Sequence, residues 1–151
     1  MLELARPMDW DAVNRLSVQV HDLHVSWRPD IYFHCDAPYS KNDFMDHIAE
    51  RRVYVAKMQN TVVGYLVVSF QCKGGAGTVA SKSMRLDSIC VDETLRGRGI
   101  GKEMMRDVRV LAKAFGCSEM ILGVHPENDD AVGFYQKCGF LIRTINMDMK
   151  L

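Results

Sequence analysis

The sequence lacks the features that mark several classes of protein. No apolar run approaches the roughly 20 residues that a helix needs to cross a bilayer, and the first residues lack the apolar stretch of a secretory signal. Lysine plus arginine and aspartate plus glutamate both number 19, so the basic excess of a nucleic-acid binder is missing. The five cysteines include no C-x-x-C pair. We therefore expect a cytoplasmic protein with free thiols, and neither a nucleic acid nor a membrane as its partner.

What is present fits one folded domain over residues 1–151. Hydrophobic residues make up 48% of the chain and charged residues 25%, close to the globular average, and no repeat or linker divides it. The charge is unevenly distributed, however. Residues 1–50 carry nine acids and four bases, whereas residues 96–113 carry six bases and two acids. This asymmetry favours two ligands, or two parts of one ligand, bound at different places.

Hydrophobic periodicity predicts the elements of the fold. Helices are expected from the N-cap Asp9 to Pro29, after the N-cap Ser40, over 99–115 and over 129–137. Strands are expected over 2–6, 53–58, 61–70, 84–91, 119–124 and 144–151. The last of these alternates strictly between apolar and polar residues. Gln59-Asn60 is expected to form a hairpin turn, and residues 72–83 a mobile, loop-like hairpin tip.

The order β-α-α-β-β-β-α-β-α-β predicts an α/β fold with a central mixed sheet and helices on both of its faces. Residues 84–91 and 119–124 flank a helix, and such a crossover makes the two strands parallel. The hairpins on either side make the remaining pairs antiparallel.

Three glycines stand where a strand gives way to a helix, in the segment Arg96-Gly97-Arg98-Gly99-Ile100-Gly101-Lys102. Unpaired N–H groups at a helix start bind phosphate readily, and three basic side chains add charge there. A Rossmann loop would need a glycine where Lys102 stands. A P-loop motif that ended at Lys82-Ser83 would need two glycines at positions where the sequence has other residues. The remaining alternative is a set of helix-entry glycines with solvated arginines.

Two motifs together resemble the GNAT superfamily of N-acetyltransferases. The first is Arg96-x-x-Gly99-x-Gly101. The second, Asn128-x-x-Ala131-x-x-Phe134-Tyr135-x-Lys137-x-Gly139-Phe140, lies on the helix after the next strand. The two motifs cover roughly residues 84–140, and the predicted element order agrees with the superfamily over the whole chain.

The resemblance implies that acetyl-CoA binds between two parallel strands that splay apart. The pyrophosphate would lie on backbone N–H groups of the glycine segment, and the pantetheine arm would pair with the preceding strand and with Asn128. The implied cofactor-binding residues are Ile89, Cys90, Val91, Arg96, Gly97, Arg98, Gly99, Ile100, Gly101, Lys102 and Asn128. Locally, Asn128 could equally be a turn residue before a helix that Asp129 caps.

For catalysis, the resemblance implies that Tyr135 donates a proton to the leaving thiolate or holds the sulfur by a hydrogen bond, while Phe134 packs in the core. The alternative is a Tyr135 that only packs beside Phe134. Asp87 is the first candidate for the base that deprotonates the amine; the alternative is an Asp87 paired with Arg85. Another acidic position of the superfamily corresponds to Gly123 here. His125 and Glu127 remain reserve candidates for the base.

The acceptor side is expected near the first helices, with His24, Trp27, Tyr32 and Phe33 at its mouth. Ordinary packing is the alternative for these side chains. His21 and His24 share a helix face, but no third ligand at a fixed spacing indicates a metal, so we expect none. The acids of residues 1–50 favour a cationic acceptor if they line that side, and not if they simply face solvent.

The predicted function is transfer of the acetyl group of acetyl-CoA to a primary amine of a small molecule or peptide, by direct attack in a ternary complex. A covalent route through Cys90 is disfavoured, because no histidine base is adjacent. The alternative is a catalytically inactive acyl-CoA-binding sensor or regulatory module. A homodimer is compatible with the sequence, which does not decide the oligomeric state.

Overall fold

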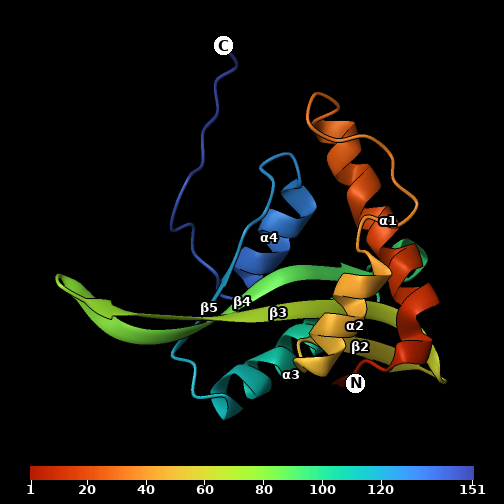
Figure 1. The fold of residues 1–151 in the computed structure, drawn as a ribbon, viewed down its shortest axis with the longest axis horizontal. Coiled ribbons are helices and arrows are strands. Elements are labelled where there is room, and N and C mark those ends of the chain that lie inside the picture. Colours follow the sequence, from red (N-terminus) through yellow and green to blue (C-terminus); the bar gives the residue numbers. More distant parts are fainter.

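The computed structural model describes all 151 residues (Figure 1). Its helices are α1 (Trp10–Trp27), α2 (Lys41–Ala49), α3 (Ile100–Ala114) and α4 (Asp129–Lys137), with short 3-10 helices at Pro7–Asp9 and Glu93–Leu95. Its strands are β1 (Leu2–Leu4), β2 (Val53–Met58), β3 (Thr61–Gly75), β4 (Thr78–Val91) and β5 (Glu119–Leu122). No helix combines the length and apolar character needed to span a bilayer.

The five strands form one sheet in the order β1-β2-β3-β4-β5. The first three pairs are antiparallel, and β4 and β5 are parallel, which confirms the predicted mixed sheet and the crossover through α3. Figure 1 shows α1 and α2 on one side of the sheet and α3 on the other.

Alternation along the central strands builds a core on each face of the sheet. Residues 62–68 of β3 include six buried apolar side chains that point to the two faces in turn. Val63, Leu66 and Val68 pack with the buried face of α3. Tyr65 and Val67 pack on the other face, in the cluster that includes α1 and α2. A strand buried on both faces reads as one apolar run, as this one does.

The hairpin between β3 and β4 is longer than the sequence predicts. Gln59 and Asn60 do form the first hairpin turn, with positive φ angles of 49° and 63°. Residues 72–83, expected as a loop, instead continue both strands up to a turn near Gly77. Backbone pairing propagates outward from the buried part of the two strands and does not require apolar side chains, so composition alone misjudged this segment.

The predicted strand over 144–151 is wrong for the single chain. Residues 140–151 form no regular element, and no backbone–backbone hydrogen bond involves residues 141–151. A strand needs a neighbouring edge for its N–H and C=O groups, and here the segment extends away from the sheet (Figure 1).

Helix starts follow local hydrogen bonds. Ser40 caps α2 by accepting from the Asp43 N–H at 3.1 Å, as predicted. Asp9 precedes α1 but makes no side-chain cap there. Its buried carboxylate accepts from the Arg6 N–H at 2.8 Å and pairs with Lys57 at 3.0 Å. Asp9 thus occupies the predicted N-cap position of α1, but its carboxylate bonds to Arg6 and Lys57 and leaves the first turn of the helix without a side-chain cap.

Candidate functional site

The glycine segment forms a tight turn between β4 and α3. Gly97 and Gly99 adopt positive φ angles of 76° and 85°, a region that side chains with a Cβ rarely occupy. Gly99 is the N-cap of α3. A Cβ at Gly101 would lie 3.3 Å from the Phe134 ring, so this glycine lets α4 approach α3 closely.

The turn leaves a run of backbone donors free. Residues 96–102 use none of their backbone N–H groups in a hydrogen bond within the protein; the first N–H of the helix to be bonded belongs to Glu103, which donates to Gly99. None of the basic side chains of Arg96, Arg98 and Lys102 forms a salt bridge. Free donors, a helix N-terminus and unpaired cations together make an anion-binding turn.

Asp92 anchors this turn to α1. The Asp92 side chain is 10% exposed, and its carboxylate pairs with Arg15 and accepts from the Thr94 N–H at 3.1 Å. The Arg15 guanidinium is the main cause that lowers the pKa of Asp92 from 3.8 to about 2. The pair thus ties the start of the glycine turn to the helix that covers the opposite face of the sheet.

This ion pair predicts a pH-dependent loss of stability. Because the folded-state pKa is depressed, the carboxylate stabilises the fold above pH 4, and that contribution is lost as the pH falls towards 2. We expect Asp92→Asn to lower the free energy of unfolding by about 2 kcal/mol at pH 7. Urea unfolding measures this free energy. Glu93→Gln, which changes an exposed side chain, is the control and should leave the free energy of unfolding unchanged. An Asp92→Asn deficit as large at pH 2 as at pH 7 would contradict the assignment.

The parallel strands β4 and β5 separate at the level of the site. Their pairing covers four residues of each strand and ends at Leu86 opposite Leu122. Beyond it, β4 continues to Val91 and remains paired with β3 only. The backbone of residues 87–91 therefore faces the β5 side without a strand partner. The expected strand 119–124 is shorter for this reason and ends at Leu122.

A β-bulge turns Asp87 towards the helices α1 and α2. Val67 pairs with Ser88 and Val68 pairs with Leu86, so Asp87 is the extra residue between them. The bulge shifts the alternation by one, so Leu86 and Ile89 face the α3 side, while Asp87 and Ser88 both line a pocket on the other face.

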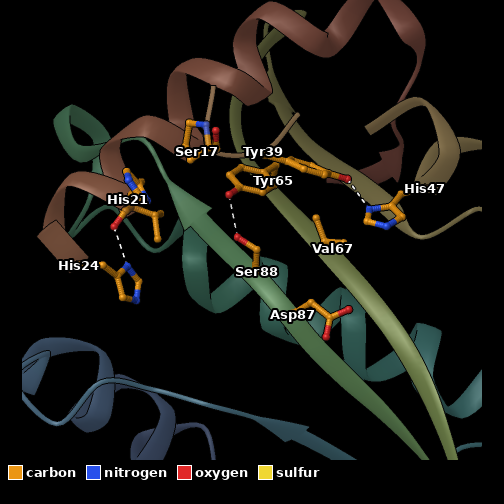
Figure 2. Close-up of a pocket in the computed structure, with 11 residues that line it drawn as sticks. Ser17, His21, His24, Tyr39, His47, Tyr65, Val67, Asp87 and Ser88 are labelled. Carbon is orange, nitrogen blue, oxygen red and sulfur yellow. Dashed lines mark hydrogen bonds between the residues drawn. The ribbon is translucent and has the colours of Figure 1, made fainter. Parts of the chain in front are cut away.

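This pocket has a volume of about 300 Å³ and lies between α1, α2 and the bulge (Figure 2). It is lined by Ser17, Val20, His21, His24, Pro38, Tyr39, His47, Tyr65, Val67, Asp87 and Ser88. None of the nine acids of residues 1–50 is among them, so those acids do not line this pocket. Asp87 is the only carboxylate of the lining.

Two hydrogen bonds organise the pocket walls. Tyr65 and Ser88 share one at 2.7 Å, and Tyr39 and His47 share another at 2.8 Å, as Figure 2 shows. Burial raises the pKa of both tyrosines well above the usual range. Both phenols are therefore neutral near pH 7 and can serve as hydrogen-bond donors or acceptors.

Asp87 is both in the pocket and ion-paired. Its carboxylate lies 3.3 Å from Arg52, 3.2 Å from Arg85 and 3.0 Å from the Ser69 hydroxyl. Asp87 therefore fits both expectations at once: it lies in the pocket, as the candidate base should, and it is paired with Arg85. The superfamily can carry an acid at the position of Gly123. A Cβ added to Gly123 would lie 3.9 Å from the Arg85 guanidinium.

Tyr135 packs against the core cluster on the α3 face of the sheet, whereas Cys90 belongs to the cluster on the α1 and α2 face. Tyr135 packs with Phe134 and Phe140 at ring distances of 5.4 and 5.8 Å. Burial, with smaller effects of Cys138 and Cys90, raises the pKa of Tyr135 to about 12, so the phenol is protonated near pH 7. Burial also raises the pKa of the Cys90 thiol to about 11, which opposes a nucleophilic role.

Asn128, and not Asp129, caps α4. Its side-chain oxygen accepts from the Ala131 N–H at 3.2 Å. The capping role considered for Asp129 is therefore wrong, because that residue is already the first of the helix. The side-chain amide nitrogen of Asn128 makes no hydrogen bond within the protein and stays available to a ligand.

The four residues expected at the acceptor mouth are only partly brought together. His24 lines the pocket and contacts the rings of Trp27 and Tyr32 at 5.4 and 5.7 Å. Trp27 stacks on His125 at 5.1 Å and so joins α1 to the segment after β5. Phe33 is 81% exposed and lies outside the pocket lining. No group of three or more potential metal ligands gathers in the structure.

Of the eleven lining residues, sequence reasoning predicted only His24 and Asp87 as site residues; those it missed include Tyr39, His47, Tyr65 and Ser88. Tyr39 lies in an aromatic segment, which was a usable signal. Tyr65 and Ser88 sit in strands where they resemble ordinary core and edge positions, and only the pairing of β3 with β4 brings them together.

The turn and the pocket define a protein that can hold an anionic ligand in the gap between parallel strands and a second, small ligand across the sheet. The chain belongs to the acetyltransferase (GNAT) family, whose model matches residues 17–140.

Individual known proteins support the same placement. The chain is similar to glucosamine 6-phosphate N-acetyltransferase 1 of Oryza sativa subsp. japonica, with 34% identity over 64 residues, 42% of this chain and 37% of that protein. It spans less than half the length of the curated relatives it matches. A crystal structure of a mutant protein from Bacillus halodurans is 26% identical, with a TM-score of 0.95 over 100% of this chain and 99% of that one.

An aminoglycoside N-acetyltransferase solved in complex with CoA shares the fold, with 18% identity and a TM-score of 0.72 over 100% of both chains.

Proposed function

We propose that the protein is an acetyl-CoA-dependent N-acetyltransferase that acts as one domain over residues 1–151 in the cytoplasm. It would transfer the acetyl group to a primary amine of a small molecule or peptide by direct attack in a ternary complex. The observation that carries this proposal is the run of free N–H groups at 96–102, next to the gap between β4 and β5. Family membership and the CoA complex of the aminoglycoside enzyme support the same ligand.

The residues around the turn suit the parts of CoA. The pyrophosphate would accept from the free N–H groups, with Arg96, Arg98 and Lys102 supplying positive charge. The pantetheine arm would pair with the backbone of residues 89–91, as an added strand does; the Val91 carbonyl there already accepts from the Arg96 side chain at 3.1 Å. The free amide nitrogen of Asn128 can donate to that arm.

Two side chains would move the protons of the reaction. Acetyl-CoA supplies the activated thioester; the amine nitrogen forms a bond to its carbonyl carbon as the carbon–sulfur bond breaks. Asp87 would accept the proton that the amine loses, directly or through water, and Tyr135 would give its phenolic proton to the leaving sulfur. Asp87 lines the pocket on the α1 and α2 side of β4, and Tyr135 packs against the core cluster on the α3 side.

The pocket favours a small primary amine. Asp87 is its only carboxylate, and it already faces two arginines, so the lining does not select for a strongly cationic acceptor. Three histidines, two tyrosines and Ser88 offer hydrogen bonds to a polar substrate.

The cofactor site can be tested at Gly99, whose Cβ would point into open space beside the free N–H groups. Asparagine and aspartate tolerate its left-handed conformation about equally, so Gly99→Asn is a matched control for charge. We expect Gly99→Asp to bind acetyl-CoA at least about tenfold more weakly than Gly99→Asn, or about 1.4 kcal/mol. Isothermal titration calorimetry measures both affinities. Equal affinities in two folded variants would place CoA elsewhere.

A further inference from the structure

The proposed reaction needs more than one proton acceptor. A primary amine enters from neutral solution as an ammonium, whose nitrogen carries three protons, and the nitrogen of the amide product carries one. Two protons must therefore leave the nitrogen, one before it attacks the thioester and one after its bond to the carbonyl carbon has formed. The Asp87 carboxylate holds one proton at a time, so the second proton calls for another acceptor in the same pocket.

His24 of α1 lines this pocket, and its imidazole is fixed in one tautomer. Its Nδ1 lies 2.9 Å from the carbonyl oxygen of Val20, one turn earlier in the helix (Figure 2). A carbonyl oxygen only accepts hydrogen bonds, so Nδ1 carries the proton. In the neutral ring Nε2 then carries a lone pair, and it makes no hydrogen bond or ion pair within the protein. The ring thus presents a free proton acceptor at its outer end.

The other two histidines of the pocket are bound differently. The outer nitrogen of His21, Nε2, lies 2.8 Å from the carbonyl oxygen of Phe33 and donates to it. The Nδ1 of His47 shares a hydrogen bond with the Tyr39 hydroxyl, and a hydroxyl can donate or accept, so this bond does not fix the tautomer. Of the three, His24 alone combines a tautomer fixed by a carbonyl with a free outer nitrogen.

His24 also connects the pocket with the segment that follows β5. Its ring centre lies 6.4 Å from that of His125, in this segment, and 5.7 Å from that of Tyr32, in the loop after α1. β5 ends at Leu122, where its pairing with β4 stops and the gap between the two strands opens. His24 therefore lies on the side of the pocket that faces this segment, towards the gap in which the thioester would lie.

We propose that His24 is the second proton acceptor of the reaction: its Nε2 takes the proton that the attacking nitrogen loses once its bond to the carbonyl carbon has formed, directly or through one water. The nitrogen keeps the electron pair of the N–H bond that breaks. The electrons of the carbon–sulfur bond leave with the sulfur, which receives the Tyr135 proton. One of the two protons taken from the nitrogen restores the Tyr135 phenol through solvent and the other is released, so atoms and charge balance. The inference rests on the proposed function and adds a residue to its mechanism.

The tautomer can be measured without any substrate, by nitrogen NMR of the imidazole rings in the full chain. The spectrum of His24→Gln assigns the His24 signals by their loss. We expect the neutral His24 ring to carry its proton on Nδ1 and none on Nε2. A neutral ring with its proton on Nε2 would overturn the proposal, because the nitrogen that faces the pocket would then be a donor.

The role in proton transfer is tested by the pH profile of kcat at saturating amine, with ethanolamine, phenethylamine and glycinamide as probes. His24→Asn keeps a donor to the Val20 carbonyl but removes Nε2, and His24→Gln places a non-basic amide near the position of Nε2. We expect both variants to lower kcat by roughly 10²-fold near pH 7 and to lose one ionisation on the acid side of the profile, with acetyl-CoA affinity unchanged. His21→Gln, the control from the same helix and pocket, should keep that ionisation.

The control is needed because other groups of the lining also titrate: Asp87, His21, His47, Tyr39 and Tyr65. Two results would overturn the inference alone. One is a wild-type ionisation that persists in both His24 variants, and the other is a His24→Gln kcat equal to that of the wild type, because an amide accepts hydrogen bonds but not protons. No thiol release by the wild type with any of the three amines would contradict the proposed function, and the inference with it.

Discussion

We expect Tyr135→Phe to lower kcat by roughly 10²-fold while acetyl-CoA affinity is unchanged. The substitution removes one hydroxyl and little volume. Burial raises the pKa of this phenol to about 12, so it carries its proton near pH 7 and can give it to the thiolate that leaves. Without that proton, the sulfur would leave as an unpaired thiolate in the buried surroundings of α4. Burying an unpaired charge costs free energy and raises the barrier of the reaction.

The matched control is Tyr54→Phe, which removes a buried phenol from the same core cluster but away from the gap. It should leave kcat unchanged. Single-turnover kinetics with each variant separates the chemical step from product release. A Tyr135→Phe enzyme with an unchanged chemical step would leave Tyr135 as a packing residue of α4.

The second large effect is expected at Asp87. If its carboxylate takes the proton of the amine, Asp87→Asn should lower kcat/KM for the amine by roughly 10²-fold. The affinity for acetyl-CoA should remain, because the bulge and the glycine turn do not depend on the charge. Activity of the variant should also recover in part as the pH rises, since more of the amine then arrives unprotonated.

Glu50→Gln is a close control for this variant. Glu50 pairs with the same arginine, Arg52, at 2.8 Å, but does not line the pocket. A loss of activity that both substitutions share would come from Arg52. A loss confined to Asp87→Asn, with the altered pH profile, would identify the base. No change in either variant would move the role to another group, such as His125.

The sequence predicted those parts of the fold that depend on local periodicity. The bounds of α3 and α4 and the parallel pairing of β4 and β5 follow from patterns of apolar residues and glycines within short windows. The glycine turn was predictable for the same reason, since Gly97, Gly99 and the helix start are adjacent in the chain.

The features that the sequence could not predict arise from pairing between distant segments. The bulge at Asp87 exists because of its register with Val67 and Val68, which no local pattern encodes. The pocket joins Tyr39 and Tyr65, whose side chains meet only after α1, α2 and β3 are packed. The C-terminal alternation was real, but a strand also has to lie along a sheet edge, and here the segment extends away from the sheet.

An enzyme that transfers acetyl to an amine differs in one respect from an acyl-CoA-binding sensor. An acyl-CoA-binding sensor would share the anion-binding turn and would bind acetyl-CoA, but it would not consume it. Family membership and the geometry of the turn are compatible with both, so binding alone does not separate them.

Release of free CoA thiol from acetyl-CoA, measured with a panel of neutral, anionic and cationic primary amines, tests acetyl transfer most directly. We predict thiol release that depends on one class of amine, saturates with its concentration, and produces the acetylated amine in equal amount. Tight binding of acetyl-CoA without amine-dependent thiol release across the panel would contradict the enzyme and favour the sensor.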